Sequence, residues 1–116
     1  MMYKVYICAP YSDFTIDNKH YSKEDNARRA SKIAKEQSEK VPNCLPIAPQ
    51  VYLDKVLCDK VANDYDACME FCYGMLNQCV EILVCTFNGY VSSGMKKEIE
   101  FASQNDIPIK FLREEK

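Results

Sequence analysis

Strand-like apolar runs alternate with helical patterns along this chain, and the alternation limits the possible folds more than any other feature of the sequence. The run at 80–86, Val-Glu-Ile-Leu-Val-Cys-Thr, is largely apolar, as expected of a central strand covered on both faces. Further strands are predicted at 2–9, 44–48 and 107–112, and Pro108 favours a sheet edge for the last of these. Alternating strands and helices need right-handed crossovers, so the sequence predicts an α/β fold with a parallel sheet and helices on both faces.

Helix boundaries are predicted from capping residues and apolar spacing. Ser22 is a suitable N-cap with Asp25 at the capping-box position, so a helix is expected to begin there. The remaining helices are expected at 50–58, from Asn63 or Asp64 to about Gln78, and from the Ser92-Ser93-Gly94 step onward. The polar and aromatic residues 11–21 are expected to form a long loop, and residues 87–90 a turn.

Composition excludes several classes of function. The chain has 116 residues, a length that fits one domain spanning 1–116. A net charge of −2 provides no basic surface for nucleic acid, and no apolar run approaches the length of a membrane span. The first residues enter a strand pattern without the layout of a signal peptide. We therefore expect a cytoplasmic protein with neither a nucleic acid polymer nor a membrane among its partners.

Seven cysteines could indicate a disulfide or zinc framework, but their spacing favours buried thiols. Cys68, Cys72 and Cys79 follow the apolar face of the predicted long helix, and Cys8 and Cys85 lie inside strand-like runs. Cys44 and Cys58 are isolated, no Cys-x-x-Cys pair occurs, and the single histidine, His20, lies in a polar segment. This pattern is typical of a reducing compartment, where cysteine acts as a small buried hydrophobe. It predicts no disulfide and no metal, and no cofactor is expected.

Glu98 is the strongest candidate for a functional residue. Met95, Ile99 and Ala102 form an apolar stripe on the predicted helix, and Glu98 falls on the same stripe. A carboxylate against apolar surface costs free energy unless it is paired, hydrogen-bonded or protonated, and such costs occur mostly at functional sites. The alternative is that Glu98 lies at the edge of the stripe and reaches water, or caps a neighbouring loop.

The expected carboxyl ends of the strands carry polar side chains. In parallel sheets ligands bind beyond these ends, so the loops at 9–12, 48–50 and 87–93 are candidate ligand contacts. Their candidate binding residues are Tyr11, Ser12, Gln50, Asn88, Ser92, Ser93 and Gly94. A helix N-terminus at the Ser-Ser-Gly step attracts a phosphate or carboxylate, although a serine there is more often only an N-cap. Tyr6 lies within the first strand, and its hydroxyl needs a partner that Glu98 could supply.

Four segments carry a resemblance to a known family: Tyr6–Ser12, Pro46–Pro49, Ser92–Ala102 and Ile107–Ile109. In this order they resemble the nucleoside 2-deoxyribosyltransferase-like superfamily, most closely its small uncharacterised bacterial and phage branch. The most specific part is the Gly-x-x-x-Glu step from Gly94 to Glu98. The resemblance covers nearly the whole chain and implies a flavodoxin-like three-layer sandwich with a parallel sheet of four to five strands.

The resemblance also implies cleavage of the N-glycosidic bond of a nucleoside or nucleoside 5′-monophosphate, by hydrolysis or by transfer of the base. Glu98 matches the nucleophile that attacks the anomeric carbon, and Tyr6 matches the tyrosine that orients it. Ser92 matches the serine that holds a 5′-phosphate in relatives that hydrolyse monophosphates. Relatives are commonly dimers or larger, with neighbouring subunits closing the site, so a homo-oligomer is expected.

Some positions depart from the pattern of the family. Cys72 stands where many relatives have an aspartate that holds or protonates the base, and the loop before Gly94 contains Asn88 and no acid. The glycine of the first strand is replaced by Ala9-Pro10. These departures favour the alternative of a non-catalytic module that binds a nucleotide or a nucleotide-derived signal in the same cleft. A third reading, a structural or partner-binding protein, leaves Glu98 solvated.

Overall fold

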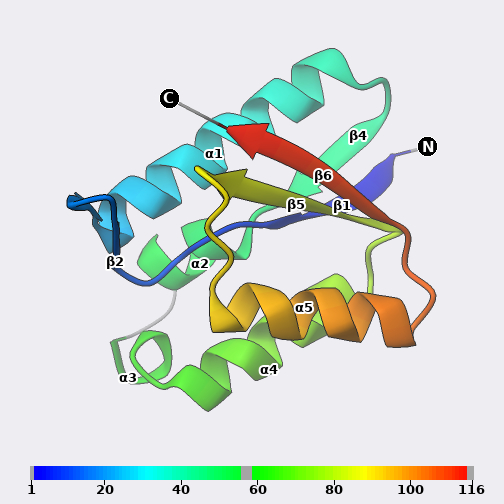
Figure 1. Cartoon of the computed structure of the whole chain (residues 1–116). Helices are drawn as coiled ribbons and strands as arrows, with labels where there is room; N and C mark the ends of the chain where they lie inside the picture. Colours follow the sequence, from blue (N-terminus) through cyan, green and yellow to red (C-terminus); the bar gives the residue numbers. More distant parts are fainter. Residues whose placement is uncertain (1, 56–58, 115–116) are drawn as a thin grey trace.

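The computed structural model describes residues 2–55 and 59–114, and a parallel sheet forms its centre (Figure 1). The strands of this sheet are β1 (Tyr3–Cys8), β4 (Cys44–Ile47), β5 (Glu81–Phe87) and β6 (Ile109–Glu114). Their order across the sheet is β4-β1-β5-β6, and each neighbouring pair is parallel. The apolar run at 80–86 was predicted to lie inside the sheet and the proline-containing segment at 107–112 at its edge. The positions of β5 and β6 confirm both predictions.

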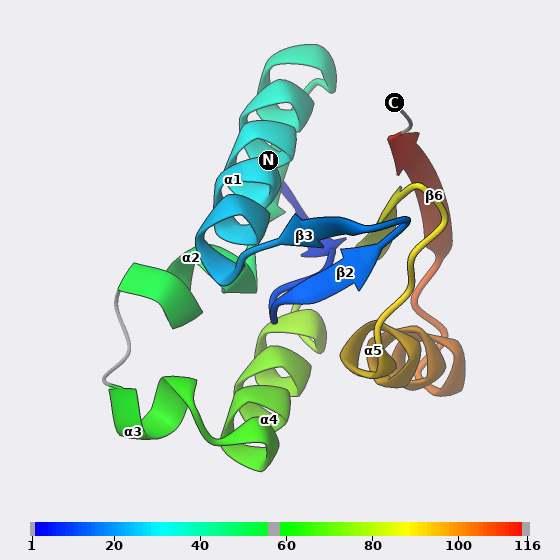
Figure 2. The same ribbon diagram turned by 60° about the vertical axis from the view of Figure 1, so that its left-hand side comes forward.

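Helices cover both faces of the sheet, as the alternation predicted (Figures 1 and 2). They are α1 (Lys23–Lys40), α2 (Pro49–Lys55), α3 (Asp59–Ala62), α4 (Tyr65–Leu76) and α5 (Ser93–Gln104). Helix α1 packs on one face, whereas α4 and α5 pack side by side on the other. The result is the flavodoxin-like three-layer α/β sandwich expected from the sequence. None of the helices in the described part of the chain has the length and apolar composition needed to cross a membrane.

Alternating side chains of the two central strands build two separate cores. Tyr6, Cys8, Ile82 and Val84 face α4 and α5, and Val5, Ile7, Leu83 and Cys85 face α1. All eight are buried, which explains why β1 and β5 contain few polar residues. Because side chains alternate along a strand, Tyr6 and Cys8 of β1 point toward the same helices, α4 and α5.

The structure differs from the sequence prediction at residues 11–21. Instead of a loop, this segment contains an antiparallel hairpin of β2 (Phe14–Ile16) and β3 (Lys19–Tyr21). Its turn residues, Asp17 and Asn18, have φ angles of 50° and 62°, the left-handed conformation that two-residue hairpin turns require. The ring of Phe14 stacks on that of Tyr21 at a centroid distance of 4.7 Å, which stabilises the pairing of two very short strands.

Other boundaries follow the sequence closely. Ser22 caps α1 by accepting a hydrogen bond from the backbone N–H of Asp25, as predicted. Asp64 caps α4, which decides between the two expected starts of that helix. The helix predicted at 50–58 is present as α2 up to Lys55, and its last three positions lie outside the described residues. Helix α3 was not predicted because a single turn has no periodicity to detect.

Candidate active site

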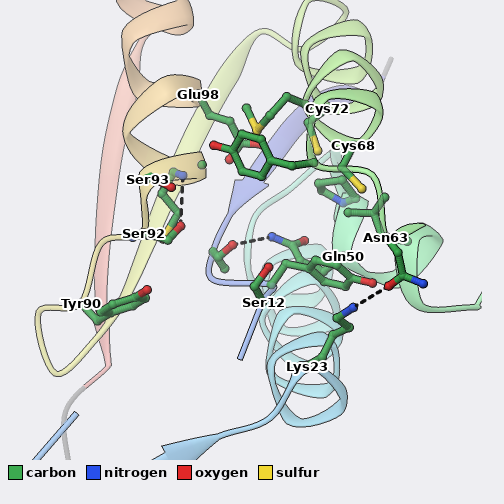
Figure 3. A pocket seen from close by; sticks show the side chains of 18 residues that line it. Ser12, Lys23, Gln50, Asn63, Cys68, Cys72, Tyr90, Ser92, Ser93 and Glu98 are labelled. Atoms are coloured by element: carbon green, nitrogen blue, oxygen red, sulfur yellow. Dashed lines mark hydrogen bonds between the residues drawn. The ribbon is translucent and has the colours of Figure 1, made fainter. Parts of the chain in front are cut away.

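A cavity of about 300 Å³ opens at the carboxyl ends of β1, β4 and β5, where ligands bind in sheets of this kind (Figure 3). The β1 and β4 sides of its wall contribute Ala9, Tyr11, Ser12, Pro49, Gln50 and Leu53. The α1 and α4 sides contribute Lys23, Asn63, Tyr65, Cys68, Met69 and Cys72, and the α5 side contributes Tyr90, Ser92, Ser93, Gly94, Met95 and Glu98. Six of the seven predicted ligand-binding residues are thus gathered at one cavity.

Glu98 lies at the wall of this cavity with only 6 % of its surface exposed. The Tyr6 hydroxyl donates a hydrogen bond to Oε2 of the carboxylate, and the Cys8 thiol donates to Oε1 at 3.3 Å. The predicted burial of Glu98 and its predicted hydrogen bond from Tyr6 are both present. A solvated Glu98, which the structural or partner-binding reading requires, is excluded. The contact from Cys8 was not predicted, because a thiol in a strand gives no sign of its partner.

Burial controls the acidity of the groups around this carboxylate. Burial raises the pKa of Glu98 from 4.5 to about 7, although hydrogen bonds from Tyr6, Cys8 and Cys72 oppose the rise. Burial also raises the pKa of Cys72 to about 12, with a further contribution from the nearby Glu98 charge. The pKa of Tyr6 is raised well above its usual value for the same two reasons. The partners of the carboxylate therefore keep their protons at neutral pH and remain uncharged donors.

The first turn of α5 forms the side of the cavity next to Glu98. Ser92 is the N-cap, and its Oγ accepts the backbone N–H of Met95 at 3.1 Å. Because an oxygen that accepts one hydrogen bond can still donate its own proton, the Ser92 hydroxyl remains able to donate to a ligand. A Cβ placed on Gly94 would lie 3.6 Å from Sδ of Met69, an ordinary contact. The glycine therefore leaves this part of the cavity wider than an alanine would.

Gln50 is a buried polar residue in the cavity wall, with 3 % of its surface exposed. Its Nε2 donates to the carbonyl oxygens of Ile7 at 3.3 Å and Ala9 at 2.9 Å. Both partners can only accept, so they fix the orientation of the amide. The other amide atom, Oε1, is buried without a hydrogen-bond partner among the described residues. An acceptor in this state is a candidate contact for a donor group on a ligand.

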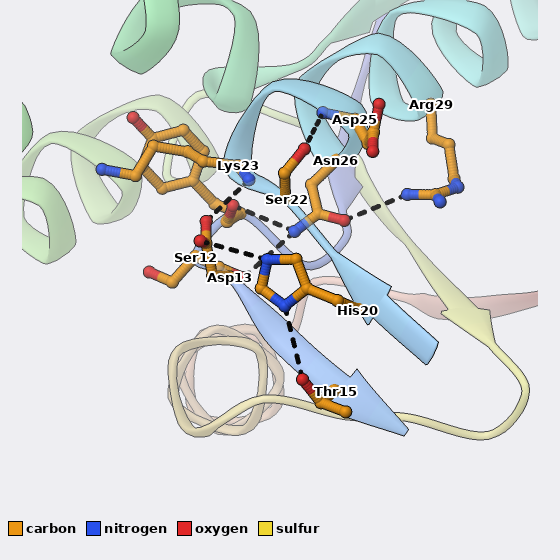
Figure 4. Close-up of polar contacts among 10 residues, drawn as sticks. Ser12, Asp13, Thr15, His20, Ser22, Lys23, Asp25, Asn26 and Arg29 are labelled. Atoms are coloured by element: carbon orange, nitrogen blue, oxygen red, sulfur yellow. Dashed lines mark hydrogen bonds and ion pairs between the residues drawn. The ribbon is translucent and has the colours of Figure 1, made fainter. Parts of the chain in front are cut away.

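Asn26 determines the position of the loop that carries Tyr11 and Ser12 (Figure 4). Its side chain is fully buried, and Nδ2 donates to the backbone oxygens of both loop residues at 3.1 and 3.0 Å. The amide oxygen accepts from Arg29 at 3.1 Å. The only available signal in the sequence was a polar residue on the inner face of a predicted helix, next to the apolar Ala27.

Lys23 is a cavity residue that the sequence did not suggest. Its ammonium nitrogen lies 3.4 Å from Oδ1 of Asn63 and 5.2 Å from the ring centroid of Tyr11. No carboxylate of the described residues lies within ion-pair distance of it. Figure 3 shows Lys23 and Glu98 at opposite ends of the cavity. The site therefore presents a cationic end and an anionic end.

Asn88 is the predicted binding residue that does not line the cavity. It occupies the turn after β5 with a φ angle of 54°, and its Nδ2 donates to the Tyr21 hydroxyl at 3.2 Å. The same turn positions Tyr90, whose ring stacks on Phe14 at a centroid distance of 3.9 Å and forms part of the cavity wall. The turn and the β2–β3 hairpin thus support each other beside the site.

The cysteines of the described residues form no disulfide with one another, and they lie in strands, helices and the turn that follows α4. Cys58 lies outside the described residues. Within residues 2–55 and 59–114, no group of three or more histidine, cysteine, aspartate or glutamate side chains is arranged to hold a metal ion.

The architecture is a nucleoside 2-deoxyribosyltransferase-like fold. The 2-deoxyribosyltransferase from Bacillus psychrosaccharolyticus matches with a TM-score of 0.66 and 10 % sequence identity, over 95 % of this chain and 72 % of that enzyme. The 2-deoxyribosyltransferase from Leishmania mexicana matches with a TM-score of 0.62 and 15 % identity, over 96 % of this chain and 64 % of that one. The chain thus spans slightly less than two thirds of the Leishmania protein, and at these identities the similarity establishes the fold.

The sequence assigns the chain to a narrower group of proteins than the fold does. It belongs to the family described as Domain of unknown function (DUF7768), whose model matches residues 3–112. No curated protein matches the sequence.

Proposed function

We propose that this protein cleaves the N-glycosidic bond of a nucleoside or nucleoside 5′-monophosphate, with Glu98 as the nucleophile. The observation that supports the proposal most directly is a buried carboxylate, held at both oxygens, in the wall of a cavity of ligand size. A carboxylate nucleophile needs a fixed orientation and little water around it, and Glu98 has both. The similarity in fold to two 2-deoxyribosyltransferases adds support.

The proposed reaction has two displacements. Glu98 attacks the anomeric carbon while the base leaves, through a transition state of oxocarbenium character, and gives a glycosyl ester. Water or a second base then attacks the same carbon and releases the carboxylate. Tyr6 and Cys8 hold the carboxylate oxygens, so little reorientation is needed during either step. The ionised form is the nucleophile, and with a pKa of about 7 Glu98 supplies it increasingly as the pH rises through neutrality.

A phosphorylated substrate suits the side of the cavity that is formed by the first turn of α5. The Ser92 hydroxyl and the first turn of α5 offer hydrogen-bond donors to a phosphate, and a helix N-terminus favours an anion. Lys23 supplies a positive charge elsewhere in the same cavity. We propose hydrolysis of a monophosphate as the favoured form of the activity, in a cytoplasmic homo-oligomer of this single domain.

A non-catalytic binding module is the second candidate. Cys72, with its pKa of about 12, occupies the wall next to Glu98 where the resemblance leads one to expect an aspartate. A thiol of this kind does not readily give up a proton, and protonation of the base is one way to make it leave. The binding module would use the same cavity and the same polar groups, but would release no base.

Release of free base from a panel of nucleosides and 5′-monophosphates tests the proposal. The wild type should release base from at least one compound, and Glu98→Gln should bind that compound without releasing base. Glu100→Gln is the matched control, because it removes an exposed carboxylate from the same helix and should leave release unchanged. Full release by Glu98→Gln would refute the nucleophile assignment. Tight binding without release by the wild type would instead support the binding module.

A further inference from the structure

When it is ionised, Glu98 is a buried anion whose hydrogen-bond partners are all neutral. They are the hydroxyl of Tyr6 and the thiols of Cys8 and Cys72. A buried charge is normally compensated by an opposite charge, and hydrogen bonds from neutral donors replace only part of the lost hydration. In the described part of the chain no cationic side chain pairs with this carboxylate. A ligand can therefore supply the positive charge that pairs with the Glu98 carboxylate.

Sulfur and aromatic groups make up much of the cavity wall. Helix α4 contributes Cys68, Met69 and Cys72, and tyrosine rings line other parts of the cavity. Sulfur atoms and aromatic faces are favourable neighbours for a planar cationic ring, through polarisable contacts and cation–π attraction. Lys23 lies at the far end of the cavity, so it does not oppose a cation next to Glu98 (Figure 3).

The same wall is unsuited to protonating a departing base. Cys72 holds its proton tightly, with a pKa of about 12, and burial also raises the pKa of Cys68. Efficient general acids have a pKa near the working pH, and neither thiol meets that condition. A base that departs without taking up a proton avoids this difficulty.

We propose that the substrate is an N-glycoside whose base is a cationic heteroaromatic ring, of the N-alkylpyridinium or N7-alkylpurine class. This inference rests on the proposed function and names its substrate. An oxygen of Glu98 bonds to the anomeric carbon while the carbon–nitrogen bond breaks. The electron pair of that bond moves to the ring nitrogen and cancels its positive charge, so the base leaves neutral and no proton is transferred to it. Water then displaces the Glu98 carboxylate from the sugar and releases one proton to solvent.

The test compares compounds that differ only in the charge of the base. 7-Methylguanosine and guanosine form one pair, their 5′-monophosphates form a second, and nicotinamide riboside with its 5′-phosphate extends the cationic set. We expect base release from the cationic members, and release from the neutral members slower by about 100-fold or more after division by each uncatalysed rate. Equal or faster release from the neutral members would overturn the inference and leave the proposed function standing.

Binding to Glu98→Gln separates this inference from the proposed function. At about pH 8 the wild type should bind the cationic member of each pair more tightly than Glu98→Gln does, by about tenfold or more, because Glu98 is then largely ionised. Affinity for the neutral members should change little, and Glu100→Gln should behave as the wild type. If no compound loses its base but this charge-dependent binding is found, the proposed function fails and the cationic ligand class stands. If binding of the cationic members is unaffected by Glu98→Gln, the inference is refuted.

Discussion

Replacing Glu98 with glutamine should remove a pH dependence of stability that the buried carboxyl group gives to the fold. Burial raises its pKa from 4.5 to about 7 in the folded state, so the folded chain keeps a proton that the unfolded chain releases. The contribution of Glu98 to the free energy of unfolding is therefore fully present below pH 4.5 and is lost as the pH rises to about 7. Because one pKa unit corresponds to about 1.36 kcal/mol, the wild type should lose about 3 kcal/mol relative to Glu98→Gln across this interval.

Urea unfolding at a series of pH values from about 4.5 to 8 measures this difference directly. Glutamine makes different hydrogen bonds from glutamate, and this offsets the free energy of unfolding of the variant by an amount that does not depend on pH. The test is therefore the change with pH of the difference between wild type and variant. Glu100→Gln is the control, because its carboxylate is exposed on the same helix and the difference from wild type should stay nearly flat. A flat difference for Glu98→Gln as well would show that the folded carboxyl group titrates normally, which would refute the reasoning.

Three further variants test other parts of the site. Ser92→Ala should weaken the binding of 5′-monophosphates more than that of nucleosides in calorimetry, by about 1.5–3 kcal/mol for a lost charge-assisted hydrogen bond; equal weakening would contradict the phosphate role. Cys8→Ala should raise the pKa of Glu98 in a carbon-13 NMR titration, because it removes a donor to the ionised form, and an unchanged pKa would count against that contact. Phe14→Ala should lower the free energy of unfolding by about 3 kcal/mol, because it removes a buried ring stacked on Tyr90; a loss below about 1 kcal/mol would mean that the hairpin is not packed as described.

Features with a period were predictable from the sequence, because burial repeats along a strand or helix. The central position of 80–86 followed from its apolar run, and the burial of Glu98 followed from its place on the stripe with Met95 and Ile99. The partnership with Tyr6 needed one further argument, that a buried hydroxyl must find an acceptor. The resemblance to the nucleoside 2-deoxyribosyltransferase-like superfamily independently implied that Tyr6 orients Glu98.

Features that depend on contacts between distant segments were not predictable. Lys23 reaches the cavity because α1 begins beside Asn63, forty positions later in the chain, and no local pattern encodes that approach. Asn26 sets the position of the Tyr11 loop through two backbone carbonyls, which have no sequence signature at all. The β2–β3 hairpin was missed because strands of three residues are too short to show alternation, and its turn residues alone did not identify it.

The chemistry around Glu98 favours a role that depends on charge over a purely structural one. A glutamine at this position would fill the same space and still accept hydrogen bonds, and it would avoid the cost of about 3 kcal/mol that accompanies ionisation of the buried group. A structural role therefore gives no reason to prefer a carboxylate here. A nucleophile requires the negative charge, and so does a counter-ion for a cationic ligand. Because Tyr6, Cys8 and Cys72 are neutral donors, they stabilise that charge without neutralising it, and they leave it available to a bound ligand.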